Sequence, residues 1–319
     1  MVQNLNALST SSSKNIWINS TGEPLSSIGS ELLFEDLRLT IGVNYFENVY
    51  NYNTAKIIQT GSGALFLAST VNSIDGYGTG VALMEISKAG EISEILTVNN
   101  KYEGNQRLND LHIINNQIWI IYTDSATSEV NYAIYDLNLS LVDQGVAINS
   151  NINTRGVSKL ILADTDTFII SSTQAERHTE STLSLTRFTD QISETTTFEV
   201  ENIHPSEIDV GLISNDRALV TYQRSSPNGW DVFIAKIDLI NETLISEVRA
   251  NFSAFGDQVE PQLTPLEDGR LLLTWSVSGS TTKLYGRLID EDGNFTSLDV
   301  NLGLEGYQHS ASSTSDGGI

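Results

Sequence analysis

The sequence predicts an all-β protein, a β-propeller of six four-stranded blades closed by pairing of the N- and C-terminal segments. One segment, residues 257–301, divides into four strand-like pieces joined by tight turns. The same pattern recurs along the chain at a nearly constant spacing. Only 18% of the residues are charged, and serine, threonine and asparagine are abundant, as is typical of β proteins.

The clearest copy of the repeat shows why each piece is a strand. Its pieces cover residues 262–266, 270–275, 283–290 and 295–302. Aliphatic and aromatic residues dominate the second piece, and such side chains suit a pleated, half-buried surface. Asp268-Gly269 and Gly293-Asn294 are hairpin signals because glycine and asparagine reach positive φ at little steric cost. Four short strands of this kind form one propeller blade.

The turn before the second strand marks the repeat through the whole chain. It lies near residues 61, 115, 164, 214, 267 and 316, so successive turns are 49 to 54 residues apart. The second strands that follow cover residues 64–70, 117–123, 167–173, 217–223 and 270–276. The third strands cover residues 80–87, 130–137, 182–189, 231–238 and 283–290.

These strands predict a single domain over residues 1–319. The blades are residues 43–99, 100–149, 150–200, 201–251, 252–302, and 303–319 joined with 1–42. In the last blade, residues 307–315 supply the first strand, while residues 15–24 and 30–34 supply the third and fourth. The alternatives are an open array of β-sandwiches or two separate β domains. A unit split between the two ends favours the closed ring, which leaves no exposed sheet edge.

Charge excludes several classes of partner. The net charge is −23 and the isoelectric point is near 4.3, so the surface repels phosphate backbones and anionic lipids. Nucleic acid and membrane insertion are therefore not expected, and no apolar run is long enough to cross a bilayer. The chain has no cysteine, which excludes thiol catalysis and disulfides. Residues 1–15 lack the pattern of a signal peptide.

The fifth blade resembles a repeat found in large bacterial secreted and surface proteins, the RTX-type adhesins. The matching residues are Asp257, Gln258, Pro261, Asp268, Gly269, Trp275, Tyr285, Gly286, Asp290, Asp292, Gly293, Asn294, Val300 and Asn301. The match is good over residues 257–301 and fades elsewhere. The resemblance implies type I secretion or surface display and an adhesive role. The glycine- and aspartate-rich calcium nonapeptides of RTX proteins are absent from this sequence.

One segment of this blade resembles part of a calcium loop. Asp290, Asp292 and Asn294 place oxygen ligands at alternate positions, as Ca²⁺ requires. A glutamate further along the loop is missing. The alternative is an ordinary hairpin turn, for which Asp-Gly-Asn is common.

Candidate ligand-binding residues lie in less regular loops. In a propeller, the loops between second and third strands share a face with the connections between blades. Aromatic rings, amides and charged groups gather there, at Tyr45, Tyr50, Tyr52, Tyr77, Arg177, His178, Asn228 and Trp230. Sugar rings need this combination of apolar stacking and directional hydrogen bonds. The alternative is that these aromatic side chains fill gaps between blades.

The first strands carry a column of polar residues: Lys56, Asn109, Lys159, Asp209, Gln262 and Ser310. Their neighbours in the strand, such as Leu160 and Leu263, are apolar. This alternation predicts a solvated wall of the central channel on one side and packing on the other.

The expected function is a non-catalytic binding or adhesion module of a secreted or cell-surface protein, whose partner is a glycan or an extracellular protein. The four histidines lack metal-binding spacing, and neither a Gly-x-Ser-x-Gly elbow nor a phosphate loop occurs. No cofactor is required, although calcium is the cation that residues 290–294 would take. The alternatives are a structural subunit of an extracellular assembly or virion, and a propeller glycosidase or lyase.

Overall fold

The computed structural model describes residues 55–72, 74–87, 92–101, 103–148, 157–163, 166–174, 181–188, 193–199, 203–252, 256–279 and 281–305. These residues belong to two compact units, one up to residue 148 and one from residue 157 onward. Within them the chain forms β-strands and turns. It contains no helix that is long and apolar enough to span a membrane.

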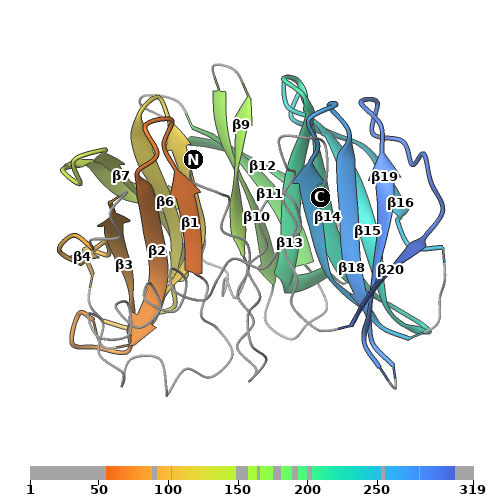
Figure 1. Ribbon diagram of the computed structural model, residues 1–319, viewed down its shortest axis with the longest axis horizontal. Helices are drawn as coiled ribbons and strands as arrows, with labels where there is room; N and C mark the ends of the chain where they lie inside the picture. Colours follow the sequence, from red (N-terminus) through yellow and green to blue (C-terminus); the bar gives the residue numbers. More distant parts are fainter. Residues whose placement is uncertain are drawn as a thin grey trace, which may run out of the picture. The chain divides into compact units, whose positions relative to one another are not determined.

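The first unit holds two four-stranded sheets, each a meander of antiparallel neighbours (Figure 1). The first sheet has the order β1-β2-β3-β4, with strands Ala55–Gln59, Leu65–Asn72, Thr79–Ile86 and Leu96–Thr97. The second has the order β5-β6-β7-β8, with strands Gln106–Ile114, Gln117–Asp124, Glu129–Asp136 and Leu141–Ile148.

The second unit holds three sheets of the same topology. The strands of the third sheet are β9 (Ser158–Ala163), β10 (Asp166–Gln174), β11 (Ser181–Phe188) and β12 (Ser193–Glu199). Those of the fourth are β13 (Ile203–Ser214), β14 (Arg217–Ser226), β15 (Gly229–Asp238) and β16 (Thr243–Arg249). Those of the fifth are β17 (Gln258–Pro265), β18 (Leu271–Val277), β19 (Lys283–Ile289) and β20 (Val300–Glu305).

These five sheets confirm the predicted four-stranded blade. The ends of the second and third strands lie within three residues of the predicted ends in every sheet. Asn115 and Asn116, predicted as a turn, both adopt positive φ (49° and 61°), as a two-residue hairpin with primed-turn geometry requires. The predicted sixth blade and the closure through residues 1–42 and 306–319 lie outside the described residues.

Alternation along each strand builds the core between neighbouring sheets. In the first unit, one face of the first sheet packs on the second, with Phe66, Leu83, Leu108 and Ile120 in one buried cluster. In the second unit, similar clusters join the third sheet to the fourth and the fourth to the fifth. Trp275, only 1% exposed, belongs to the last of these clusters. Every blade therefore depends on its neighbour to bury a face.

Ion pairs link the first strands of neighbouring blades. Lys56 Nζ lies 2.8 Å from Asp110 Oδ1, and Lys159 Nζ lies 2.9 Å from Asp209 Oδ1. Asp209 Oδ2 also accepts a hydrogen bond from the backbone N–H of Leu263, at 2.9 Å. The column that was predicted to be a solvated wall is polar, but its members are not uniformly solvated. Asn109 is only 2% exposed, and it lies at a β-bulge between Leu108 and Asp110, outside the regular strand pairing.

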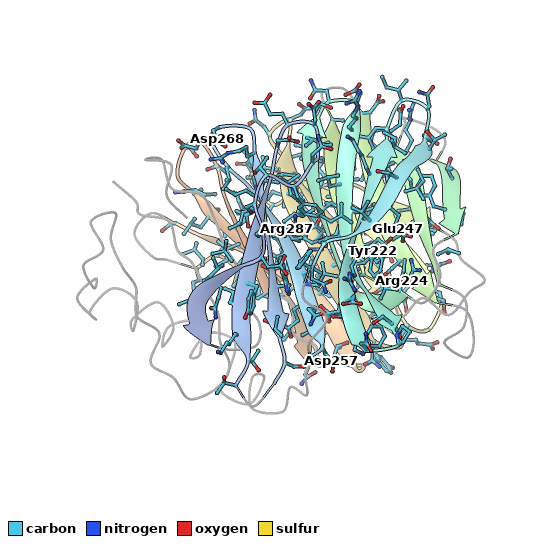
Figure 2. All side chains as sticks on the ribbon, turned by 90° about the vertical axis from the view of Figure 1, so that its right-hand side faces the viewer. Tyr222, Arg224, Glu247, Asp257, Asp268 and Arg287 are labelled. Atoms are coloured by element: carbon cyan, nitrogen blue, oxygen red, sulfur yellow. The ribbon has the colours of Figure 1, made fainter. Side chains whose placement is uncertain are left out.

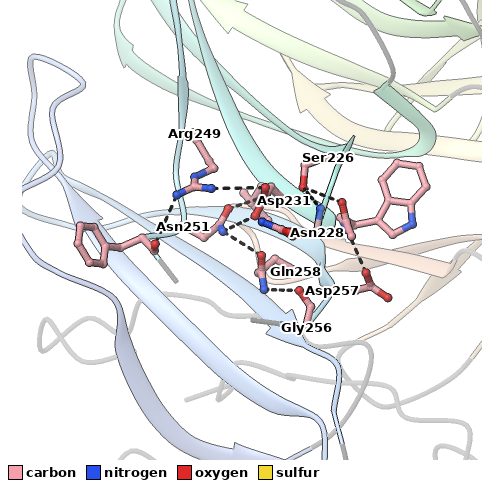
Figure 3. A network of polar contacts seen from close by, with 12 residues as sticks. Ser226, Asn228, Asp231, Arg249, Asn251, Gly256, Asp257 and Gln258 are labelled. Atoms are coloured by element: carbon pink, nitrogen blue, oxygen red, sulfur yellow. Dashed lines mark hydrogen bonds and ion pairs between the residues drawn. The ribbon is translucent and has the colours of Figure 1, made fainter. Parts of the chain in front are cut away.

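A buried asparagine joins the fourth blade to the fifth (Figure 3). Asn251 Oδ1 accepts a hydrogen bond from the backbone N–H of Val232, at 2.8 Å. Its Nδ2 donates to Asp231 Oδ1 at 2.7 Å and to Gln258 Oε1 at 2.9 Å. Gln258 Nε2 donates in turn to the carbonyl of Gly256, at 2.7 Å. One amide thus holds the third strand of one blade and the first strand of the next.

The connector of the first unit also contains a hydrogen-bonded asparagine and glutamine. Asn99 Oδ1 accepts from the backbone N–H of Val81 at 2.9 Å, and Gln106 Nε2 donates to the carbonyl of Glu103 at 2.9 Å. Seven positions separate the asparagine from the glutamine in both connectors. The partner of the asparagine differs, since Asn99 Nδ2 donates to Asp75 Oδ2 and the Lys101 carbonyl.

A tyrosine in the fourth blade lies against an ion pair (Figure 2). The hydroxyl of Tyr222 donates to Glu247 Oε1, and Arg224 Nη1 lies 2.9 Å from Glu247 Oε2. The guanidinium of Arg224 also lies 4.7 Å from the centroid of the Phe233 ring. Burial, and then the hydrogen bond to Glu247, raise the pKa of Tyr222 far above its ordinary value.

Replacement of Asn251 by alanine should destabilise the second unit. The change removes the Asn251 bond from three buried groups, the N–H of Val232, Asp231 Oδ1 and Gln258 Oε1, at about 1–3 kcal/mol for each group left unsatisfied. Urea unfolding measures the loss. Asn228→Ala, at an exposed turn position, is the matched control. Equal midpoints for the two variants would show that the buried amide does not link the blades.

Replacement of Tyr222 by phenylalanine should reduce the decline of the free energy of unfolding at alkaline pH. Because the pKa of Tyr222 is raised on folding, the folded chain holds this proton above about pH 10 while the unfolded chain releases it. The stabilisation is complete below pH ~10 and falls as pH rises further. The free energy of unfolding, measured between pH ~8 and ~11, should therefore decline less steeply in Tyr222→Phe. Tyr77→Phe, whose side chain is exposed, should keep the wild-type slope.

Candidate functional site

Loops between second and third strands lie beside the connections between blades, as predicted. In the fifth blade, the N–H of Ser278 donates to the carbonyl of Asp257 at 2.8 Å, and the N–H of Asp257 donates to Ser278 Oγ at 3.3 Å. In the second blade, Ser125 and Asn105 form the same reciprocal pair, both bonds being 2.9 Å. The connector and the loop of one blade therefore form a single hydrogen-bonded surface in each unit.

The residues that precede Gln258 and Gln106 in the connectors bond to a further loop on this surface, the loop before the third strand of the preceding blade. Asp257 Oδ1 accepts from the backbone N–H of Trp230 at 3.0 Å, where the third strand of the fourth blade starts. Asn105 Oδ1 accepts from the N–H of Thr79 at 3.1 Å, in the corresponding place of the first blade. Gly104 and Gly256 precede these residues with φ of 92° and 77°, a conformation that other residues rarely adopt. A Cβ at Gly104 would lie 2.7 Å from the Cβ of Ala126, so the close approach also needs glycine.

In the second unit, this surface contains a cavity of about 380 Å³. The connector contributes Gly256 and Gln258, and the loop after β18 contributes Ser278, Gly279 and Thr281. Strands β18 and β19 contribute the remaining walls, together with Asp299 just before β20. The volume falls at the lower end of the range for small-molecule sites, roughly 300–1,000 Å³.

Two stacked aromatic rings line the cavity. Trp275 and Tyr285 are cross-strand partners in β18 and β19, and their ring centroids are 6.3 Å apart with planes 19° from parallel. Trp275 is buried, while Tyr285 is only partly buried. The tryptophan supports the tyrosine from the core, which leaves part of the Tyr285 ring available to an apolar surface of a ligand.

Polar groups surround the aromatic wall. Asp299 Oδ2 accepts from the backbone N–H of Phe252 at 2.8 Å, and Asp299 Oδ1 lies 3.8 Å from Arg287 Nε. Arg287 also donates to the carbonyls of Ser297 and Ala250, at 2.9 and 2.5 Å. Burial lowers the pKa of Arg287 from its usual value, and Asp299 partly opposes that shift. The aspartate at the cavity is thus held by a cation and a backbone donor.

The predicted ligand-binding residues fall into three groups. Tyr45, Tyr50, Tyr52, Arg177 and His178 lie outside the described residues. Tyr77 lies in the first unit and is 61% exposed; its N–H donates to Asp75 Oδ1 at 3.0 Å. Asn228 and Trp230 lie in the second unit, where Trp230 reaches the connector through Asp257. Of the three candidates that the structure describes, the Asn228–Trp230 segment is the one that contacts the connector beside the cavity.

The predicted calcium ligands form a hairpin turn. Asp290 Oδ1 accepts from the N–H groups of Asp292 and Asn294, at 3.0 and 2.7 Å. Asp136 makes the same contacts, two and four residues further on, in the corresponding turn of the second blade, and Asp238 of the fourth blade accepts from the N–H groups two and three residues further on. Among the described residues, no group of three or more histidine, aspartate or glutamate side chains gathers to hold a metal ion. Calcium binding at residues 290–294 stays a prediction.

Sequence reasoning missed the cavity because its aromatic residues look like core. Trp275 and Tyr285 were identified as repeat positions, and both do pack in the sheet. A usable signal was present in the spacing of Asn99 to Gln106 and of Asn251 to Gln258. That spacing identifies the connectors between blades. Loops from two blades meet at a connector, and the cavity lies beside one of them.

This arrangement suits the binding of a small, amphipathic ring. Tyr285 offers an apolar face, Ser278 and Thr281 offer hydroxyl groups, and Lys283 offers a cation. Gln258 is not available, because its amide already bonds to Asn251 and Gly256. The lining of the cavity thus offers groups for stacking and for hydrogen bonding.

Comparison with known proteins identifies the fold. No model of a protein family matches this chain, and neither does any curated protein. A protein of unknown function from Dyadobacter fermentans DSM 18053 aligns with a TM-score of 0.56 at 11% identity, over 81% of this chain and 86% of that one. The GH93 α-L-arabinofuranosidase of Fusarium graminearum, solved with arabinobiose, aligns with a TM-score of 0.53 at 13% identity, over 81% and 82%. An α-L-arabinanase of Penicillium chrysogenum, also complexed with arabinobiose, gives 0.52 at 13% identity over the same shares. At such identities the likeness shows the fold alone, a β-propeller of four-stranded antiparallel blades.

Proposed function

We propose that this chain is a non-catalytic, glycan-binding module of a secreted or cell-surface protein and serves in adhesion. The observation that carries the proposal is the cavity of the fifth blade, in which the supported ring of Tyr285 stands beside the hydroxyl groups of Ser278 and Thr281. Stacking on an aromatic face with a few fixed polar groups is how proteins hold sugar rings. The resemblance of residues 257–301 to repeats of bacterial surface adhesins supports the adhesive role.

The acidic surface is consistent with a module that binds glycans through a specific cavity. A net charge of −23 keeps the chain soluble and disfavours adsorption to nucleic acid or anionic lipid, so binding would depend on the cavity. The Trp230 segment adjoins the cavity through Asp257 and would extend the contact surface. The loops with Tyr45, Tyr50, Tyr52, Arg177 and His178 remain candidates for further contacts.

A glycan array tests the proposal, read with and without Ca²⁺ and including arabinobiose, the sugar of two structures that share the fold. Binding to a defined set of glycans supports the proposal, and no binding across broad glycan classes contradicts it. Release of sugar from arabino-oligosaccharides would instead indicate a glycosidase. Large ordered oligomers in electron micrographs, without glycan binding, would indicate a structural subunit.

Replacement of Tyr285 by alanine should weaken glycan binding by about tenfold or more, equal to about 1.4 kcal/mol, because the stacking face is lost. Tyr285→Phe should retain most of the affinity. Calorimetric titration with the best array ligand measures both. Tyr77→Ala, an exposed loop tyrosine of the other unit, is the matched control. Equal affinities for Tyr285→Ala and wild type would place the ligand elsewhere, with Trp230→Ala the next variant to test.

We also propose the sixth blade, formed by the two ends of the chain. The face of the first sheet that does not contact the second carries the buried residues Leu67, Val71, Ala82, Met84 and Ile86. In the fifth sheet, Leu272 and Leu284 are buried but do not belong to the cluster shared with the fourth sheet. The predicted sixth blade would pack against these two apolar faces, with its strands supplied by the chain ends.

Deletion of residues 303–319 should accordingly expose a strand edge and apolar surface, and the shortened chain should aggregate. Size-exclusion chromatography and thermal unfolding measure this. A soluble shortened chain that unfolds cooperatively at the wild-type temperature would refute the closure.

A further inference from the structure

Cations in this chain are scarce, and most of the lysine and arginine side chains that the structure describes have a partner. There are 17 lysine and arginine residues against 40 aspartate and glutamate residues. Lys56, Lys101 and Lys159 each lie within 2.9 Å of a carboxylate oxygen, and Lys236 donates to the backbone carbonyl of Asp292. The ammonium group of Lys283 forms neither an ion pair nor a hydrogen bond within the part of the chain that the structure describes. Lys283 is exposed, so its ammonium group is accessible to a ligand.

Lys283 lies at the cavity. It begins β19 and lines the cavity together with Tyr285, two residues further along. Residues two apart in a strand point to the same face of the sheet, so the ammonium group of Lys283 and the ring of Tyr285 face the same cavity. In the backbone register, Lys283 is the cross-strand neighbour of Glu305.

The other charged group of the cavity is already compensated. Asp299 bonds to the N–H of Phe252 and lies 3.8 Å from Arg287 Nε, so it does not depend on Lys283 for a counter-charge. No ion pair joins Lys283 to Asp299 in the structure. The cavity therefore presents one cation that no group of its own wall neutralises.

We propose that the cavity binds a carboxylate-bearing sugar residue, such as a uronic acid, with its ring against Tyr285 and its carboxylate on Lys283. This inference rests on the proposed glycan binding and specifies the class of sugar. Ser278 and Thr281 supply hydroxyl groups for the ring hydroxyls. A charge-assisted hydrogen bond from an ammonium group to a carboxylate is stronger than a neutral one.

The rest of the surface limits which acidic glycans fit. A chain of many uronic acids would bring its other carboxylates against a surface with a net charge of −23. A single acidic residue within or at the end of a neutral glycan avoids that repulsion, because charges beyond about 8 Å are largely screened at physiological salt. The cavity should therefore prefer isolated acidic sugars to polyuronates.

Calorimetric titration with matched sugars tests the inference on the full chain. The ligands are oligosaccharides ending in glucuronic or galacturonic acid and the same oligosaccharides with that carboxyl group reduced to the alcohol. Wild type should bind the acid about three- to tenfold more tightly than its reduced form. Lys283→Gln should abolish this preference while binding of the neutral form stays, and Lys283→Arg should keep it. Lys101→Gln, which removes an exposed lysine of the first unit, is the matched control and should behave as wild type.

The outcomes separate the two proposals. Equal binding of acid and alcohol, or a preference for the acid that survives in Lys283→Gln, overturns the inference but leaves glycan binding intact. Failure of wild type to bind any glycan of either kind overturns the proposed function as well. Thermal unfolding of each variant confirms that a loss of preference reflects the cavity and not loss of the fold.

Discussion

The buried amide at the end of a fourth strand is the interaction on which the rest of the structure depends. A propeller chain must leave one sheet at its outer strand and return to the inner strand of the next, through a connector packed between both. The backbone groups of such a connector need partners once they are shielded from water. Asn99 and Asn251 lie in such connectors, and each accepts a hydrogen bond from the N–H of a residue in the third strand of its own blade. Without these bonds a buried N–H of that strand would lose its partner in the connector.

The cavity is a result of this constraint. Because Asn251 and Gln258 hold the connector in place, Asp257 can join the Trp230 segment to the Ser278 loop. The first unit has the same connector chemistry with different surrounding residues, since Asn99 bonds to Asp75 where Asn251 bonds to Asp231 and Gln258. A repeated scaffold therefore carries surfaces that differ from blade to blade, and the walls around Trp275 and Tyr285 are one such surface.

The strands could be predicted from the sequence and the cavity could not. Apolar runs such as residues 117–123 and 217–223, each preceded by an asparagine-containing turn, determine where strands start and end, because local turn chemistry and alternation act over a few residues. Register irregularities such as the one beside Asn109 depend on packing against a neighbouring blade, which no local pattern contains. Tyr285 illustrates the same limit. Its place beside Trp275 follows from strand pairing, but its partial exposure depends on where the connector and the Ser278 loop lie.

The contacts of Asp209 bear on how the second unit folds. Repeat proteins are commonly treated as rows of units in which each unit interacts only with its nearest neighbours. Asp209 of the fourth blade couples two such nearest-neighbour contacts in one side chain, because its two carboxylate oxygens bond to Lys159 of the third blade and to the backbone of Leu263 in the fifth. Loss of the third blade would leave this carboxylate with half of its partners and would weaken its hold on the fifth. The three blades should therefore unfold as one cooperative unit, with a sharper transition than three independent pairings would give.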